Sequence, residues 1–144
     1  MPSVFSRIID GELPARFVWS DDRCVAFLSH RPLRPGHTLV VPRLEVDHWL
    51  DLEPDLLSHL MGVSHRIGRA LQHGFQPLKV GMIIAGLEVP HVHVHLVPFQ
   101  TMDQLNFARV DPNPLPEDQD RAAATIRESL ATLGFAPATS DLGR

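Results

Sequence analysis

The chain has 144 residues, of which 44% are hydrophobic, with a formal net charge of −4 and a single cysteine, Cys24. This length suits one globular domain, residues 1–144, that closes its own hydrophobic core. The basic residues are scattered, which excludes the cationic stripe that binding to a nucleic-acid backbone requires. One cysteine excludes an internal disulfide and any Cys-x-x-Cys site, and it favours a reducing compartment.

No segment has the pattern of a signal peptide or of a membrane span. Asp10 and Glu12 interrupt the N-terminal segment where a signal peptide has an unbroken apolar run. No stretch approaches the ~20 apolar residues of a membrane-spanning helix. We therefore expect a soluble cytoplasmic protein without a membrane partner.

The first part of the chain predicts a short helix followed by strands. Apolar residues over 4–9 have helical spacing, and Gly11 and Pro14 end the run. Further segments are rich in β-branched and aromatic residues and are bounded by turn residues, which predicts strands. These segments are 17–19, 24–28 and 38–41. The first two are close enough to form a hairpin, and Cys24 is expected in the core.

The longest predicted helix begins at Pro54, which fits the first helical position. Its apolar residues recur on one face and are Leu56, Leu60, Val63, Ile67 and Leu71. His73 and Gly74 predict its end. A second helix is predicted over about 117–133 with Gly134 as its end, and the last ten residues are expected to form a loose tail.

Residues 79–85 predict a central strand that ends at Gly86 and pairs antiparallel with the strand after it. Strands joined by short links, with two helices apart in the sequence, predict an α+β fold with an antiparallel sheet. Neither a Walker A loop nor a G-x-G-x-x-G motif occurs, so both glycine-rich phosphate cradles are excluded.

The strand predicted over 89–98 carries the most distinctive motif. His91, His93 and His95 alternate there with aliphatic residues, and Pro90 and Pro98 bracket the segment. Because alternate side chains of a strand share a face, the motif predicts three imidazoles on one face, spaced roughly 6.6 Å apart.

Three interpretations of these histidines follow from the residues alone. A neutral imidazole attacks phosphorus to form a covalent phosphoramidate, which requires a depressed pKa or a shared proton. A zinc site would use only two of them, because the outer two lie roughly 13 Å apart along a strand. His30, His37, Glu45 and Glu88 are the residues that would complete such a site. The third interpretation is a solvated polar face.

The motif at 91–97 resembles the His-φ-His-φ-His-φ-φ signature, with φ apolar, of the histidine-triad (HIT) nucleotide hydrolases and transferases. Three other segments resemble that family in the expected order: 4–15, 21–27 and 32–42. The resemblance covers about residues 3–99, with a C-terminal helix and tail over 100–144. The chain is thus identified as a nucleotide-binding HIT-like protein of the single-domain branch.

The resemblance implies about five antiparallel strands, one long central helix, a C-terminal helix and a nucleotide site in a homodimer. His93 would attack the α-phosphorus of a nucleoside phosphoramidate or dinucleoside polyphosphate and form a nucleotidyl-histidine, with His91 and His95 in support. That chemistry implies no cofactor and no metal. The substrate-binding residues it implies are Val4, Phe5, Ile8, Phe27 and Leu28 at the base, Ser29 and His30 at the ribose, and Leu87, Glu88 and Val89 before the triad. A nucleotide-binding module with little turnover and a zinc-dependent enzyme are the alternatives.

The chain departs from the family pattern at several of these positions. Ser29 stands where many members have Asp or Asn, and Leu87 stands where an amide is common. Glu45 replaces a frequent histidine. Glu45 and Glu88 would repel a phosphate unless they are paired or turned away, so they predict a different leaving group or altered specificity. His37 follows a loop glycine and is expected to stabilise that loop, with a site role as the alternative.

Overall fold

The computed structural model describes residues 1–135, so the predicted tail, apart from Phe135, lies outside the described residues. At its centre is a five-stranded antiparallel sheet with the order β1-β2-β3-β5-β4. Its strands are β1 (Phe17–Ser20), β2 (Cys24–Leu28), β3 (Thr38–Pro42), β4 (Lys79–Ile83) and β5 (Val94–Phe99). The α+β fold class is confirmed.

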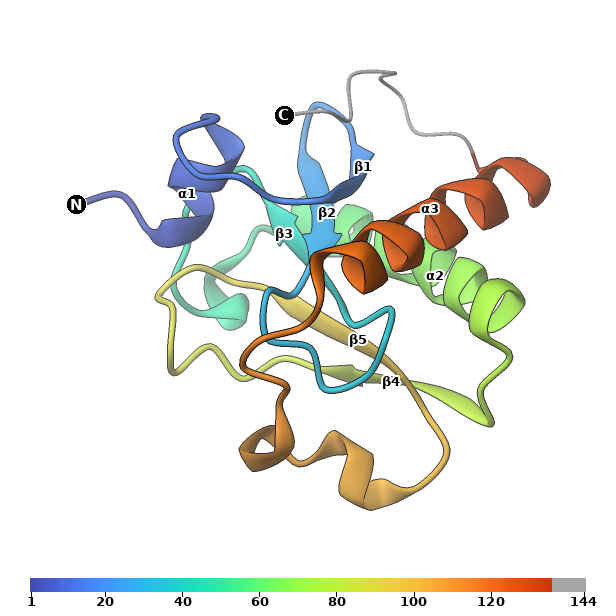
Figure 1. The fold of residues 1–144 in the computed structure, drawn as a ribbon. Helices are drawn as coiled ribbons and strands as arrows, with labels where there is room; N and C mark the ends of the chain where they lie inside the picture. The colour runs from blue at the N-terminus through green and yellow to red at the C-terminus, as the bar shows by residue number, and fades with distance from the viewer. Residues whose placement is uncertain (136–144) are drawn as a thin grey trace.

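Helices cover the two faces of the sheet unequally. The helices α2 (Pro54–Phe75) and α3 (Pro116–Thr132) lie against one face and bury the larger core with it, which includes Cys24 (Figure 1). The short helix α1 (Val4–Ile9) lies against the other face and forms a second, smaller core with Phe17, Phe27 and Leu39. No helix in residues 1–135 is long and apolar enough to cross a membrane.

The end of α2 differs from the prediction. The helix continues through Gly74 to Phe75, and Gln76 ends it in the left-handed conformation, with φ of 51°. A Cβ atom on Gly74 would lie 2.6 Å from Cγ2 of Thr125 and 2.8 Å from Oγ of Ser129, both on α3. The glycine therefore lets the two helices approach, and it does not end the helix. The predicted end of α3 at Gly134 agrees with its φ of 78°.

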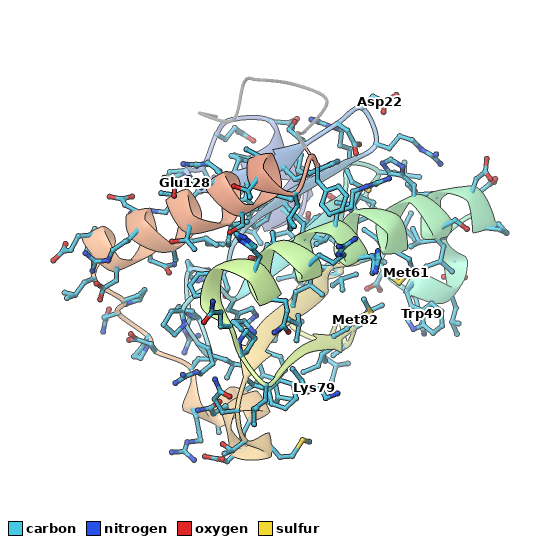
Figure 2. All side chains as sticks on the ribbon, turned by 90° about the vertical axis from the view of Figure 1, so that its right-hand side faces the viewer. Asp22, Trp49, Met61, Lys79, Met82 and Glu128 are labelled. Carbon is cyan, nitrogen blue, oxygen red and sulfur yellow. The ribbon has the colours of Figure 1, made fainter. Side chains whose placement is uncertain are left out.

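The strand predicted as central is an edge strand. β4 pairs only with β5, and the side chains of Lys79 and Met82 are exposed along it (Figure 2). Its place at the edge depends on pairing with distant segments, which its own composition does not specify.

β5 begins at Val94, not at residue 89 as predicted. Before it, the backbone N–H of Val92 donates to the carbonyl of Val46 at 2.8 Å, and the N–H of His91 donates to Val89 at 2.8 Å. These bonds take the segment out of the sheet ladder. Only His95 of the three triad histidines is paired in the sheet, opposite Leu39 on β3 and Ile83 on β4.

Candidate active site

The three triad histidines lie near the small core of α1, on the face of the sheet away from α2 and α3. His95 lies opposite Leu39, which in turn lies opposite Phe27 on β2, so these side chains share one face. The ring centroids of His93 and His95 are 4.8 Å apart in an edge-to-face arrangement. His91 and His93 are buried. The expected shared face is therefore formed, with two rings in contact.

One ring nitrogen of His93 is hydrogen-bonded to the main chain of the triad segment itself. Its Nδ1–H donates to the main-chain oxygen of His91 at 2.8 Å. In the neutral ring this leaves the lone pair on Nε2. Burial lowers the pKa of His93, although the hydrogen bond to His91 and the charge of Glu88 act in the opposite direction. At neutral pH the ring is therefore uncharged and nucleophilic at Nε2.

His95 is oriented by His37. The backbone N–H of Leu33 donates to Nδ1 of His37 at 2.9 Å, so the proton of neutral His37 sits on Nε2. That Nε2–H donates to Nδ1 of His95 at 3.0 Å, which leaves the proton of His95 on its own Nε2. Burial lowers the pKa of His37 to about 3 and that of His95 to about 4. His37 thus stabilises its loop, as expected, and also reaches the site.

His91 has both ring nitrogens occupied. Its Nε2–H donates to the carbonyl of Pro42 at 2.8 Å, and its Nδ1 accepts from the hydroxyl of Ser3 at 2.6 Å. Burial lowers the pKa of His91. With both nitrogens engaged, the ring joins α1 to the triad segment and has no nitrogen free for a ligand.

Two phenylalanines form walls beside the histidines. The ring of Phe5 on α1 lies 4.8 Å from the ring of His93 and 5.7 Å from that of Phe27, measured between centroids. The ring of Phe107 lies 4.8 Å from that of His95. The sequence did not indicate Phe107, because it lies in the short 3-10 helix η3 (Phe107–Arg109) of the polar segment after β5, whose path only the fold defines.

The structure brings some of the residues predicted to bind the substrate to this face and places others elsewhere. Phe5, Ile8 and Phe27 share the small core, and Val89 packs against it. Val4 lies on α1 with 40% of its surface exposed. Leu28 packs on the opposite face, in the larger core.

The two residues expected at the ribose have different surroundings. Ser29 is buried, and its hydroxyl accepts a hydrogen bond from the N–H of Arg31 at 3.3 Å. Its carbonyl accepts from the side chain of Gln119 at 2.8 Å, which ties the loop to α3. His30 is exposed. The hydroxyl of Ser29 therefore accepts one hydrogen bond within the loop, and its own proton is not used in that bond.

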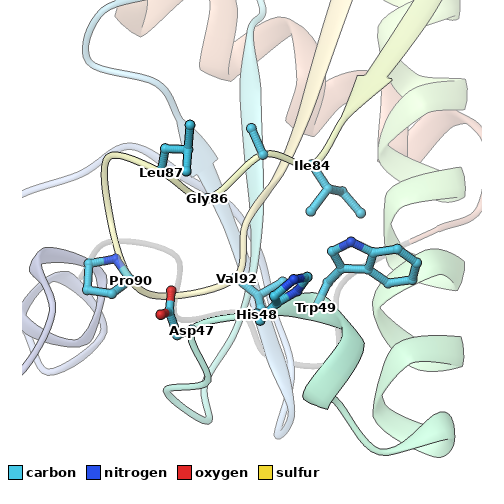
Figure 3. A pocket seen from close by; sticks show the side chains of 9 residues that line it. Asp47, His48, Trp49, Ile84, Gly86, Leu87, Pro90 and Val92 are labelled. Carbon is cyan, nitrogen blue, oxygen red and sulfur yellow. The ribbon is translucent and has the colours of Figure 1, made fainter.

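In the segment before the triad, Leu87 and Glu88 have different surroundings. Leu87 is 96% exposed and borders a pocket of about 330 Å³, together with Trp49, Ile84 and Val92 (Figure 3). Val92 belongs to the core on the α2 side, so this pocket is separate from the histidine face. Glu88 is exposed, and its charge raises the pKa of His93 slightly against the larger effect of burial.

Glu45 was expected to repel a phosphate unless its carboxylate is paired or turned away, and the carboxylate is paired through hydrogen bonds. Its Oε1 accepts from the backbone N–H of Ser3 at 2.8 Å and from the hydroxyl of Ser6 at 2.6 Å. These hydrogen bonds lower the pKa of the carboxyl group. Within residues 1–135, the structure contains no cluster of three or more His, Cys, Asp or Glu side chains that could bind a metal ion.

Comparisons with known proteins agree on one family. Residues 10–102 match the family model described as HIT domain. An uncharacterized HIT-like protein of Mycobacterium tuberculosis is 32% identical over 136 residues, which cover 91% of this chain and 94% of the relative.

Solved structures are similar as well. A hypothetical histidine triad nucleotide-binding protein from Sulfolobus tokodaii superposes with a TM-score of 0.80 at 26% identity, over 90% of this chain and 92% of that one. A zinc-bound histidine triad family protein from Mycobacterium smegmatis has a TM-score of 0.78 at 30% identity, over 91% and 94% of the two chains.

Proposed function

The chain belongs to the HIT domain family, and on this premise we propose that it is a nucleotide hydrolase or nucleotidyl transferase that acts through His93. One observation supports this assignment most directly. The Nδ1–H of His93 is bound to the carbonyl of His91, so a neutral, buried ring offers its Nε2 lone pair beside His95.

In the proposed first step, Nε2 of His93 attacks the α-phosphorus of a nucleoside phosphoramidate or dinucleoside polyphosphate. A nitrogen–phosphorus bond forms, and the bond to the leaving group breaks. The leaving atom keeps the electron pair and takes a proton from water. In the second step water displaces His93 and releases the nucleoside monophosphate, while another acceptor would give nucleotidyl transfer.

His95 has the proton arrangement needed to assist this step. Its Nδ1 accepts from His37, so its Nε2–H is the free donor of the ring. We assign that donor to a phosphoryl oxygen, where negative charge increases as His93 attacks. His91 supports His93 through its main-chain oxygen, because the ring of His91 is engaged with Ser3 and Pro42.

The nucleoside end of the proposed substrate would lie along α1. Phe5, Ile8 and Phe27 form a buried apolar and aromatic cluster beside His93, and Val4 is exposed on the same helix, so we assign the base to the edge of this cluster. We assign the ribose to the exposed His30 and to the hydroxyl of Ser29, whose proton is not used in its hydrogen bond with Arg31. Glu88, whose charge acts on His93, would lie toward the leaving group.

We propose a homodimer that forms through the free edge of β4. An edge strand offers unpaired N–H and C=O groups that pair with another strand. Met82 on β4 is 48% exposed, and Trp49 and Leu50 are also exposed large apolar side chains. An antiparallel pairing of two β4 edges would extend one sheet through both copies.

Covalent trapping tests the assignment. The protein is incubated with adenosine 5′-phosphoramidate or a dinucleoside polyphosphate, and mass spectrometry is used to locate a nucleotide on His93. We expect His93→Ala to lose both the adduct and turnover. His65→Ala, the same change at an exposed position of α2, is the matched control and should retain both. Turnover that persists in His93→Ala would refute the role of His93.

Two alternatives remain distinguishable in the same preparation. Tight nucleotide binding in calorimetry, with no product, would indicate a binding module. The relative from Mycobacterium smegmatis is described as zinc-bound, so metal content is measured as well. Stoichiometric zinc by elemental analysis, with activity lost on chelation, would favour the zinc-dependent enzyme.

A further inference from the structure

The N-terminus of α1 is fixed to the triad segment by a group of side chains that does not face the reacting nitrogen. Oε1 of Glu45 accepts from the N–H of Ser3 and the hydroxyl of Ser6, at 2.8 and 2.6 Å. The hydroxyl oxygen of Ser3 accepts from the N–H of Ser6 at 3.0 Å, and its proton is donated to His91. We call Glu45, Ser3, Ser6 and His91 the anchor cluster.

The anchor cluster holds the helix that carries Phe5. The helix α1 has 6 residues, and a helix this short is not stable without tertiary contacts. Phe5 lies in its first turn, and its ring is 4.8 Å from that of His93 and 5.8 Å from that of His91. The position of this wall therefore depends on the contacts that hold the start of α1.

We propose that Glu45 is a positioning residue that sets the affinity for the nucleoside part of the substrate by holding α1, and with it Phe5, beside His93. This inference rests on the proposed function. It also gives this carboxylate a role apart from the phosphate, because its Oε1 accepts from Ser3, which precedes α1, and from Ser6 within the helix.

The anchor cluster requires a hydrogen-bond acceptor at position 45, and it does not require a negative charge there. Both donors bind the same oxygen of Glu45, and a glutamine amide oxygen also has two lone pairs. Glu45 is exposed, so its charge is screened by solvent. Glu45→Gln therefore keeps both hydrogen bonds, whereas Glu45→Ala removes both.

The kinetic test compares these two variants with the unchanged protein. For adenosine 5′-phosphoramidate, we expect Glu45→Ala to raise KM by about tenfold, the scale of one or two lost hydrogen bonds, with kcat changed by less than about twofold. Glu45→Gln should stay within about twofold of the unchanged protein in both constants. A phosphoramidate without a base should show no difference among the three proteins.

Hydrogen exchange measured by mass spectrometry tests the anchor without any activity. Glu45→Ala should exchange faster than the unchanged protein in the peptide that contains α1, and Glu45→Gln should not. If no nucleotide is turned over, the proposed function fails while this measurement still decides whether Glu45 anchors α1.

Each other outcome overturns the proposal. Unchanged KM and unchanged exchange in Glu45→Ala would show that Glu45 does not position α1. A lower KM in both variants would mean that Glu45 repels the substrate. Equal impairment of both variants would mean that the charge, and not the acceptor, is needed.

Discussion

Nε2 of His37 lies 3.0 Å from Nδ1 of His95, and a backbone group decides which of the two rings donates. Because the N–H of Leu33 occupies Nδ1 of His37, His37 donates and His95 accepts. This order keeps the proton of His95 on Nε2. His37 is therefore a positioning residue for His95.

Replacing His37 should impair the chemical step. We expect His37→Phe to lower kcat by about a hundredfold with little change in KM, because His95 is then free to place its proton on the wrong nitrogen. His65→Phe, at an exposed position of α2, is the matched control. Circular dichroism verifies that the variant is folded. An unchanged kcat in the folded variant would contradict the role of His37.

The pH dependence of activity should follow the neutral form of His93. Burial lowers the pKa of His93, so the attacking form persists below the ordinary histidine pKa of about 6.5. We expect kcat/KM to be constant from pH 8 to about pH 6.5 and to fall only at lower pH. A profile that already falls to half its maximum above pH 7 would be inconsistent with a lowered pKa of the nucleophile.

Two glycines of α2 should respond in opposite ways to alanine. At Gly74 the added Cβ would meet Thr125 at 2.6 Å, so Gly74→Ala should lower the free energy of unfolding by about 1–3 kcal/mol. At Gly62 the nearest atom is an Arg66 side-chain nitrogen at 3.8 Å, so Gly62→Ala should raise that free energy by up to about 1 kcal/mol. Urea unfolding measures both. Equal effects would show that α3 does not restrict Gly74.

The β4 edge should carry the proposed dimer. We expect Met82→Lys to increase the dimer dissociation constant by about tenfold or more, since a charge on an edge strand opposes pairing. Sedimentation at several concentrations measures this. Met102→Lys, at another exposed methionine outside the sheet, is the control. A dimer unaffected by Met82→Lys would place the contact on another surface.

Short-range patterns in the chain predicted most of the fold. The alternation of His91, His93 and His95 with aliphatic residues predicted their common face, and the apolar spacing of residues 54–73 predicted α2. Such patterns are local because the periods of helices and strands repeat within a few residues. Together with the other family segments they also indicate the HIT family, which the match over residues 10–102 confirms.

The sequence by itself thus determined most of the elements, though not all their ends, and the family with its three-histidine motif. Only the tertiary structure decided what surrounds the triad: that Ser3 bonds to His91, that His37 bonds to His95, that Glu45 accepts from Ser6 of α1, and that Leu28 packs on the opposite face of the sheet. Ser3 and His91 are 88 positions apart, and their hydrogen bond exists only after the strands have paired in register. Such partners are set by the packing of distant segments, which no local pattern encodes.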